Sequence, residues 1–292
     1  MSAYLLYRCG AAFIRAVPRP FAYWMGLRAA DRRYARNGPD RHAVVSNLRQ
    51  IYRAKGIEPS RDVLEGVARK TFQHFGKYIA DFIRYTRLKP RDMDRLFSAE
   101  HMDYLHECRG NGRGTILATA HFGNWELGGA VITAKGYHVH TVFMPEEMQE
   151  RNRFFLEIRR QRGFSLKPYG HAAKDMLRLL RQGEMVTLLA DRDFSNRDDR
   201  IPFFGKPARL PRGPAALSMK TGAPILPGFL LRQVDDTFLM RAHKPLDPLE
   251  IGDEYEMRCE LGRVLEKEIG ENPHQWFIFH DFWNHNGQTE SI

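Results

Sequence analysis

The clearest indication of the fold is the stretch TILATAHFGNWE, residues 115–126. Its first six residues are apolar or small and follow a glycine-rich turn signal at residues 110–114 (GNGRG), which is typical of a strand buried on both faces. His121 comes directly after this strand, and Asn124 can cap a helix that we expect over residues 124–135. A buried strand that leads into a helix predicts one unit of a parallel α/β sheet.

The same alternation of strands and helices continues along the chain. Apolar runs predict further strands at residues 138–143, 185–190, 224–231 and 238–242. Helices are expected at residues 41–58, 61–86, 146–162, 172–181, 213–221 and 254–269, with a loop at residues 191–212. Because parallel strands need crossover connections, this order predicts an α/β fold with a mostly parallel central sheet flanked by helices. We expect a single domain over residues 39–292, with a helical part, residues 39–100, packed on it.

Residues 1–38 differ in composition from the rest of the chain. Seven arginines and a single acidic residue, Asp31, are interleaved with aromatic and aliphatic side chains, and Pro18 and Pro20 divide the stretch into two helical pieces. A basic amphipathic segment of this kind is typical of a membrane surface, where arginine meets lipid phosphate and aromatic rings lie at the headgroup level. The alternative is a helical hairpin packed on the domain with solvated arginines. We predict a membrane-associating segment and an anionic bilayer surface as partner.

Composition narrows the class of protein further. The 292 residues carry a formal net charge of +10, which indicates anionic partners. Cys9, Cys108 and Cys259 are too far apart for a disulfide framework or a zinc pattern and suit a reducing compartment. No stretch approaches the roughly 20 apolar residues of a membrane-spanning helix, and Arg8 and Arg15 interrupt what would be the apolar segment of a signal peptide. No signature of a nucleic-acid-binding module is present, so no nucleic-acid partner is expected.

The pair His121 and Glu126 has the residue types of an acid–base site. Open α/β sheets bind ligands at the carboxyl ends of their strands, where His121 is expected. A tight bend at Gly123 could return the Glu126 carboxylate to the imidazole, fix its tautomer and make it a general base. The alternative is a structural histidine and a glutamate that favours the helix dipole. No G-x-S-x-G elbow and no nearby cysteine offers a nucleophile, so His121 is expected to activate a substrate hydroxyl.

Two further histidines, His138 and His140, share one face of a predicted strand. They could bind a metal ion, but the H-E-x-x-H pattern is absent. Half-buried strand histidines are the favoured interpretation, and we predict neither a metal site nor a bound cofactor.

The segment HFGNWE, residues 121–126, resembles the H-x4-D/E signature of glycerolipid-type acyltransferases, in the spelling of the lipid A biosynthesis acyltransferase family. That family includes late lauroyl and myristoyl transferases and phosphatidylinositol mannoside acyltransferases. A second block agrees in order and spacing, with DRD at 191–193, FFGKPA at 203–208, PRGPAA at 211–216 and TGAPILP at 221–227. Trp276 and His280 match a W-x-x-x-H near the C-terminus, so the resemblance covers essentially the whole chain.

The resemblance implies a glycerolipid acyltransferase-like fold and a membrane-surface O-acyltransferase. A fatty acyl chain would pass from an acyl thioester of acyl carrier protein or coenzyme A to a hydroxyl of a glycolipid, such as a lipid A precursor. The reaction would take place at the cytoplasmic face of the bacterial inner membrane, on a peripheral or monotopic enzyme. His121 carries over as the general base and Glu126 as its partner.

The resemblance also implies a set of substrate-binding residues. These are Asn124, Arg159, Asp191, Arg192 and Arg212. Asn124 could shape the turn or donate a hydrogen bond near the reacting carbonyl. Arg159 could contact phosphate or pair with Asp191 at the end of a buried strand. Arg212, just before a helix N-terminus, could bind an anionic headgroup or carrier phosphate.

Two other classes of function remain open from the sequence. One is an acyl-thioester hydrolase or an N-acyltransferase on the same scaffold, and the other is a non-catalytic basic protein that binds membranes or nucleic acid. A hydrolase would release fatty acid without an acceptor. A binding protein would not depend on His121.

Overall fold

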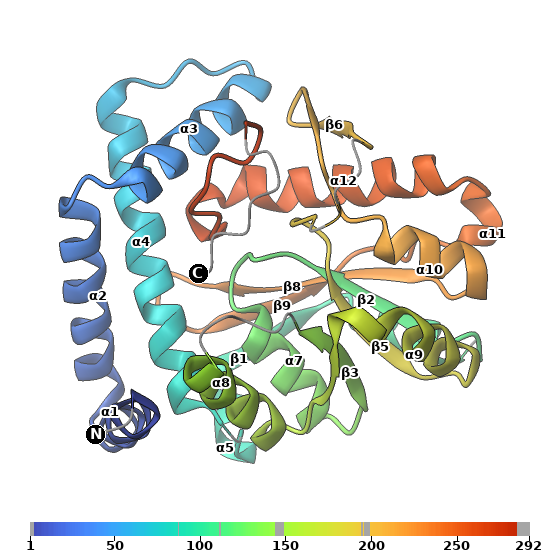
Figure 1. The fold of residues 1–292 in the computed structure, drawn as a ribbon, viewed down its shortest axis with the longest axis horizontal. Coiled ribbons are helices and arrows are strands. Elements are labelled where there is room, and N and C mark those ends of the chain that lie inside the picture. Colours follow the sequence, from blue (N-terminus) through green and yellow to red (C-terminus); the bar gives the residue numbers. More distant parts are fainter. Residues whose placement is uncertain are drawn as a thin grey trace.

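The computed structural model describes residues 3–86, 88–110, 112–143, 149–193, 195 and 199–284. Within these residues seven strands form the central sheet in the order β1-β9-β8-β2-β5-β3-β4 (Figure 1). The strands are β1 Phe97–Glu100, β2 Thr115–Thr119, β3 Val139–Phe143, β4 Ser165–Pro168, β5 Met185–Leu189, β8 Ile225–Arg232 and β9 Phe238–Ala242. Strands β8, β2, β5, β3 and β4 are parallel neighbours, whereas β9 is antiparallel to β8 and parallel to β1. The expected α/β fold with a mostly parallel sheet is confirmed.

Helices cover both faces of this sheet. In Figure 1, α12 and α10 lie on one face, and α7 and α8 lie on the other. The helices of the domain are α3 Pro39–Ala54, α4 Arg61–Arg84, α5 Pro90–Leu96, α6 Asp103–Gly110, α7 Trp125–Ala134, α8 Gln149–Gln161, α9 Tyr169–Arg181, α10 Gly213–Thr221, α11 Pro248–Ile251 and α12 Glu254–Glu271, followed by the 3-10 turn η1 Pro273–Gln275. Strand β2 is buried because its side chains alternate between two layers: Ile116 and Ala118 lie in the core on one face with no exposed surface, and Leu117 packs against the core on the other.

The strands that the sequence did not predict are short. Strand β1 is four residues long and mostly exposed, so it has no apolar run, and it places residues 97–100 in the sheet rather than in the helical part. The expected loop at residues 191–212 contains a hairpin of β6 Ile201–Phe203 and β7 Lys206–Ala208. Part of the expected helix at 146–162, its residues 146–148, lies outside the described residues, and α8 begins at Gln149.

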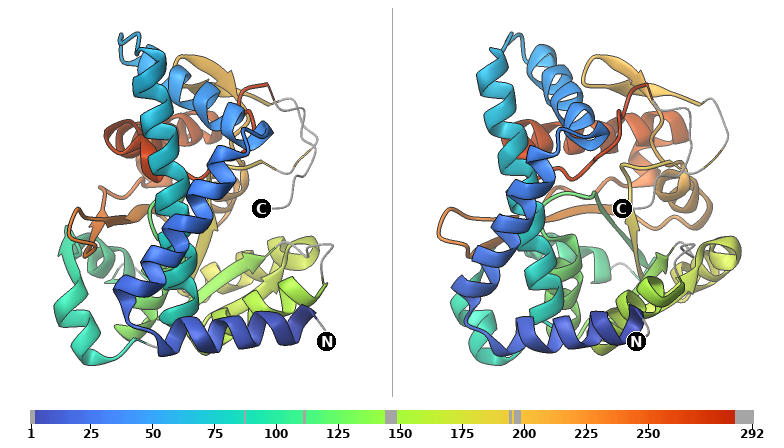
Figure 2. Two further views of the ribbon diagram at one scale, coloured as in Figure 1. Left: turned by 90° about the vertical axis from the view of Figure 1, so that its left-hand side faces the viewer. Right: turned by 60° about the vertical axis from the view of Figure 1, so that its left-hand side comes forward.

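Residues 3–35 contain two helices, α1 Ala3–Ala16 and α2 Arg19–Ala35, which confirms the break at the prolines. In both views of Figure 2, α2 runs beside α4 and α1 turns away across their end. Helices α2 and α4 touch at Gly26 and Gly76, where a Cβ on Gly26 would lie 2.7 Å from the Gly76 carbonyl oxygen. Glycine is therefore required for this close approach. None of the described helices combines the length and apolar content needed to cross a bilayer.

Helix α4 also packs against η1 through two histidine rings. His74 and His274 meet edge to face with ring centroids 4.7 Å apart. Burial, together with the neighbouring His274, lowers the pKa of His74 to about 3, and burial lowers the pKa of His274 to about 4. Both rings are therefore neutral in the folded protein at neutral pH.

This pair predicts a loss of stability on mild acidification. In the unfolded chain both histidines titrate near pH 6.5, so below that pH the unfolded state binds protons that the folded state excludes. The free energy of unfolding should fall by at most about 1.4 kcal/mol per pH unit for each histidine as the pH drops from about 6.5 toward 4. In urea titrations at pH 7 and pH 5, His74→Phe should lose less stability between the two pH values than the wild type does. An equal loss in both proteins would contradict the prediction.

Candidate active site

Strand register brings His121 and Asp191 together. Strands β2 and β5 are parallel, with Thr119 opposite Leu189, so the two side chains lie equally far beyond the paired ends of their strands. The Asp191 Oδ1 atom lies 2.8 Å from His121 Nδ1. The other carboxylate oxygen accepts the His121 backbone N–H at 2.9 Å and the Trp276 Nε1–H at 3.0 Å. The sheet thus builds a His–Asp pair at its carboxyl edge.

The environment of Asp191 sets the protonation of this pair. The carboxylate is completely buried. Burial by itself would raise the pKa of Asp191, but the adjacent His121 and the hydrogen bonds from His121 and Trp276 outweigh burial and hold this pKa below its usual range. An ionised carboxylate only accepts hydrogen bonds, so His121 Nδ1 is the donor. The second ring nitrogen, Nε2, then keeps a lone pair that can take a proton.

The turn after β2 is held by backbone hydrogen bonds from two directions. Gly123 has φ +62°, and a Cβ there would lie 2.2 Å from the Leu230 carbonyl oxygen. The Gly123 N–H donates to the Gln275 carbonyl at 2.9 Å, and the Phe277 N–H donates to the His121 carbonyl at 2.8 Å. The segment after α12 therefore fixes His121 from one side, while β8 crowds the turn from the other.

The side chain and backbone of Asn124 both take part in this turn. Its Oδ1 accepts the Leu127 N–H at 3.2 Å as the N-cap of α7, and its Nδ2 donates to Asp81 of α4 at 3.3 Å. Its backbone N–H donates to Leu230 of β8 at 2.7 Å. The residue is 1% exposed, and the contacts described for its amide group are with Leu127 and Asp81.

The expectation that Glu126 pairs with His121 is wrong in this structure, because Glu126 lies in the first turn of α7 and faces α8. Its Oε1 accepts Arg159 Nε at 2.8 Å, and its Oε2 lies 3.5 Å from Nη1 of Arg162. The α7 first turn directs this carboxylate sideways rather than back to the imidazole. The partner of His121 is Asp191.

Arg159 accordingly pairs with Glu126 rather than with Asp191, and its side chain remains one quarter exposed. The fully buried Arg162, which the sequence did not single out, also donates to the Phe82 carbonyl at 2.8 Å and the Tyr85 carbonyl at 3.0 Å. Burial lowers the pKa of Arg162 to about 10, and the charge of Glu126 opposes that shift. This ion cluster ties α7, α8 and the end of α4 together beside the turn.

The other two predicted arginines differ in position. Arg192 follows Asp191 directly and is partly buried. This burial lowers the pKa of the Arg192 guanidinium, and the negative charge of Asp191 opposes the shift. Arg212 is the N-cap residue of α10, as expected, but its Nε donates to Glu254 at 2.7 Å and lies 3.3 Å from Asp199. The described contacts of Arg212 are thus with carboxylates on other elements, and they do not include His121.

Aromatic rings surround the remaining side of His121. Trp125 meets the imidazole edge to face at 5.2 Å between centroids and stacks on Tyr78 at 4.4 Å. Phe277 lies against both Tyr78 and Trp125. Trp125 stays partly exposed. The imidazole therefore borders the Trp125 ring on one side and a buried carboxylate on the other.

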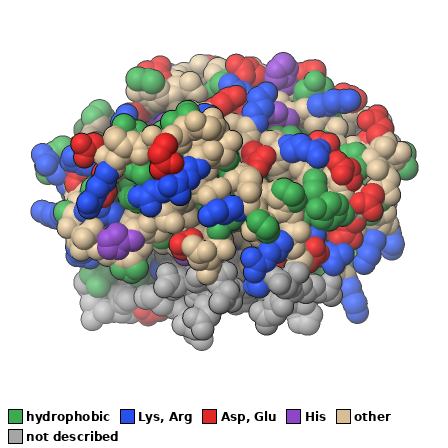
Figure 3. Space-filling model, turned by 90° about the horizontal axis from the view of Figure 1, so that it is seen from above, with side chains coloured by type: hydrophobic (Ala, Val, Ile, Leu, Met, Phe, Trp, Pro, Cys, Tyr) green, Lys and Arg blue, Asp and Glu red, His purple; other side chains and the backbone are tan. Residues whose placement is uncertain are grey.

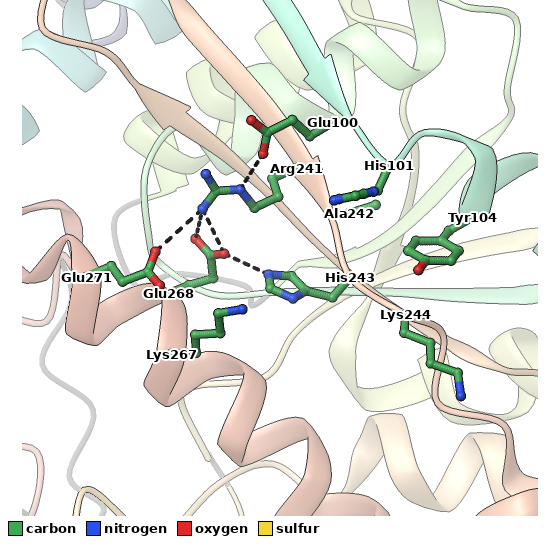
Figure 4. A pocket seen from close by; sticks show the side chains of 10 residues that line it. All are labelled: Glu100, His101, Tyr104, Arg241, Ala242, His243, Lys244, Lys267, Glu268 and Glu271. Atoms are coloured by element: carbon green, nitrogen blue, oxygen red, sulfur yellow. Dashed lines mark hydrogen bonds and ion pairs between the residues drawn. The ribbon is translucent and has the colours of Figure 1, made fainter.

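A second His–carboxylate pair lies at the opposite edge of the sheet. The pair lines a cavity of about 400 Å³, and His243 Nε2 lies 2.7 Å from Glu268 Oε1 (Figure 4). The Arg241 guanidinium also binds Glu268, at 3.1 Å, and it reaches Glu100 as well. The Glu268 charge is thus already compensated, and mostly charged side chains line the cavity. We take the pair at His121 as the candidate active site, because it lies at the carboxyl ends of the parallel strands, where open α/β sheets bind their ligands.

No group of three or more His, Cys, Asp or Glu side chains that could hold a metal ion is found in the part of the chain that the structure describes. His140 lies 3.6 Å from Glu184 and is partly buried. His138 is exposed.

Comparison with known proteins assigns the chain to a family. Residues 2–285 match the model of the bacterial lipid A biosynthesis acyltransferases. A phosphatidylinositol mannoside acyltransferase of Mycobacterium tuberculosis is 29% identical over 225 residues, which is 70% of this chain and 69% of the relative. Its namesake in Mycolicibacterium smegmatis is 26% identical over 284 residues, 95% of this chain and 90% of the relative. A lipid A biosynthesis palmitoleoyltransferase of Escherichia coli is 25% identical over 191 residues, 63% and 60% of the two chains.

The fold and the relatives together define an acyltransferase. The chain belongs to the bacterial lipid A biosynthesis acyltransferase family, as the resemblance of residues 121–126 and 191–227 indicated.

The Glu126 cluster yields a prediction about stability. Glu126→Ala leaves the buried Arg162 charge without its carboxylate, which should reduce the free energy of unfolding by about 3–5 kcal/mol. The double variant Glu126→Ala/Arg162→Met removes the uncompensated charge, so its loss should be smaller than the sum of the two single losses. Urea unfolding of the four proteins measures this coupling. Additive losses would show that the two side chains do not interact.

Proposed function

We propose that this protein is a membrane-surface O-acyltransferase in which His121 is the general base and Asp191 its partner. The observation that carries the proposal is the 2.8 Å bond between His121 Nδ1 and the buried Asp191 carboxylate at the carboxyl edge of the sheet. It leaves Nε2 as the proton acceptor. Glu126 acts in this scheme by holding α7 and α8 together beside the turn.

The reaction needs a single displacement on an acyl thioester. The acceptor hydroxyl gives its proton to His121 Nε2 as its oxygen bonds to the thioester carbonyl carbon. The tetrahedral oxyanion then collapses, the C–S bond breaks, and the leaving thiolate takes the proton from the imidazolium. The negative Asp191 stabilises the imidazolium that exists between these two proton transfers. The chain returns to its starting state with an ester and a free thiol as products.

The relatives support a glycolipid as the acceptor. Their names denote acyl transfer onto phosphatidylinositol mannosides and in lipid A biosynthesis. A lipid A precursor is the acceptor that the sequence predicted, and a mannosylated phospholipid is the second. The donor is the thioester of acyl carrier protein or of coenzyme A. Both donors are anionic and match the net charge of +10. The proposed location of the reaction is the cytoplasmic face of the inner membrane.

The catalytic assignment can be tested with three variants. Both His121→Ala and Asp191→Asn should lower kcat by about 10²–10⁴-fold, because each removes proton transfer by a correctly oriented base. The exposed His138→Ala is the matched control and should retain wild-type turnover. Mass spectrometry of lipids from expressing cells and of purified reactions supplies the measurement. A folded His121→Ala protein with full activity would refute the assignment.

The same assays separate the alternative functions. An acyl-thioester hydrolase would release free fatty acid at the same rate with and without the glycolipid. An N-acyltransferase would give an amide that survives mild alkaline hydrolysis. For an O-acyltransferase we expect an alkali-labile ester whose formation depends on the acceptor.

The surface of α1 and α2 supports membrane association. Leu6 and Phe13 on α1 are 54% and 50% exposed, and Trp24 on α2 is 51% exposed and stacks on Phe21. Exposed arginines accompany them, among them Arg8 and Arg28. At a bilayer interface, the guanidinium groups would contact the lipid headgroups, and the rings and aliphatic chains would enter the boundary with the acyl chains. By contrast, acidic and basic side chains are intermixed on the face seen in Figure 3, which gives that face no single-sign patch.

This surface predicts selective binding to anionic vesicles. The protein should co-float with vesicles that contain phosphatidylglycerol, more weakly with pure phosphatidylcholine, and less at high salt because the arginines contribute about 1 kcal/mol each. Phe13→Glu should weaken binding at least about tenfold. Val63→Glu, at a similarly exposed apolar position on α4, is the control and should not. Equal effects of the two substitutions would exclude α1 as the contact surface.

A further inference from the structure

A buried carboxylate outside the candidate active site connects helix α2 to the turn that carries His121. Asp81 of α4 is fully buried, 43 residues before Asn124. Its Oδ2 accepts Asn124 Nδ2 at 3.3 Å and also binds the Arg232 guanidinium at the end of β8. Its Oδ1 accepts the Tyr23 hydroxyl of α2 at 2.7 Å. One carboxylate thus bonds to three elements.

Tyr23 completes this arrangement. Its hydroxyl donates to Asp81 and accepts Arg232 Nη1 at 2.9 Å. Burial, with the Asp81 charge beside it, raises the pKa of Tyr23 far above its ordinary value, so the hydroxyl retains its proton. Tyr23 is 5% exposed, whereas Trp24, the next residue of α2, faces outward. Helix α2 therefore inserts one hydroxyl into the interior of the domain.

Two chains of contacts lead from this cluster to His121. The first runs from Asp81 to Asn124, which caps α7 three residues after His121. The second runs from Arg232 to Gln275: the Arg232 N–H donates to Gln275 Oε1 at 3.0 Å, and Gln275 Nε2 donates to the Arg232 carbonyl at 3.0 Å. The Gln275 carbonyl in turn accepts the N–H of Gly123. Both chains end within the turn.

We infer that Asp81 is a positioning residue for the reaction. Full turnover then requires that α2 is docked on the domain through the hydrogen bond from the Tyr23 hydroxyl to Asp81. The inference rests on the proposed function, because the base that is positioned is His121. Asp81 does not touch the reacting atoms. It orients Asn124 and Arg232, which hold the turn that aims the imidazole. Loosening this cluster should slow the chemical step without altering the binding of the acyl donor.

The chain offers a matched pair of variants. Tyr23→Phe and Tyr34→Phe each remove one hydroxyl from α2, and each hydroxyl bonds to a carboxylate of α4, Tyr34 to Glu65 at 2.5 Å. Only the first hydroxyl bonds to the cluster that holds the turn. We expect kcat about tenfold lower in Tyr23→Phe with KM for the acyl thioester unchanged, since misplaced catalytic groups reduce rate steeply. Tyr34→Phe should keep wild-type kcat. If kcat changes equally in both variants, the two hydroxyls serve only to dock α2 on α4. Asp81 would then have no particular role in positioning the turn, and the inference would be overturned.

A second measurement does not depend on the reaction. Hydrogen–deuterium exchange of the peptide that covers residues 121–127 should be at least about threefold faster in Tyr23→Phe than in wild type and unchanged in Tyr34→Phe. If exchange follows this prediction and the wild type transfers no acyl group, the proposed function fails while the positioning of the turn stands. If the wild type is active and both exchange and kcat are unaffected in Tyr23→Phe, the inference fails and the proposed function stands.

Discussion

The alignment of β2 with β5 is the constraint on which the site depends. Two parallel strands in register carry His121 and Asp191 equally far past their ends, so the imidazole and the carboxylate meet although 70 residues separate them. Burial would normally make an ionised carboxylate expensive. Here the imidazole, a backbone N–H and the Trp276 indole supply its hydrogen bonds. The sheet therefore holds a negative charge in a dry position, which is what a histidine base requires.

The other buried acids around the turn are each matched by arginine. Glu126 is held by Arg159 and Arg162, and Asp81 by Arg232. Removing one partner from such a pair costs more than the pair contributes, because the remaining charge is left without compensation. These clusters join helices α2, α4, α7 and α8 beside the turn that carries His121. Helix α2 is consequently bonded to the interior next to this turn and also forms part of the outer surface of the molecule.

Local sequence predicted most of the strands and the residues at their ends. It did not predict which side chains pair with one another. The run at residues 115–120 predicted the central strand, and its position identified His121. The apolar run at residues 185–190 likewise placed Asp191 at a strand end. His121 and Asp191 meet because β2 and β5 are neighbours in the sheet. The order of strands depends on the whole sheet and cannot be derived from the spacing of residues along the sequence. The five-residue spacing to Glu126 suggested a contact that the first turn of α7 directs elsewhere. Arg162 stood among several arginines, and only burial distinguishes it.

The most direct test of the account is the position of the ring proton on His121. In ¹⁵N NMR spectra of the neutral imidazole, assigned by comparison with His121→Gln, we expect the proton on Nδ1 in the wild type and in Glu126→Gln. In Asp191→Asn the proton should move to Nε2, because the amide can donate to Nδ1. A proton on Nε2 in the wild type, or a tautomer that changes in Glu126→Gln and not in Asp191→Asn, would contradict the assignment of Asp191 as the partner of His121.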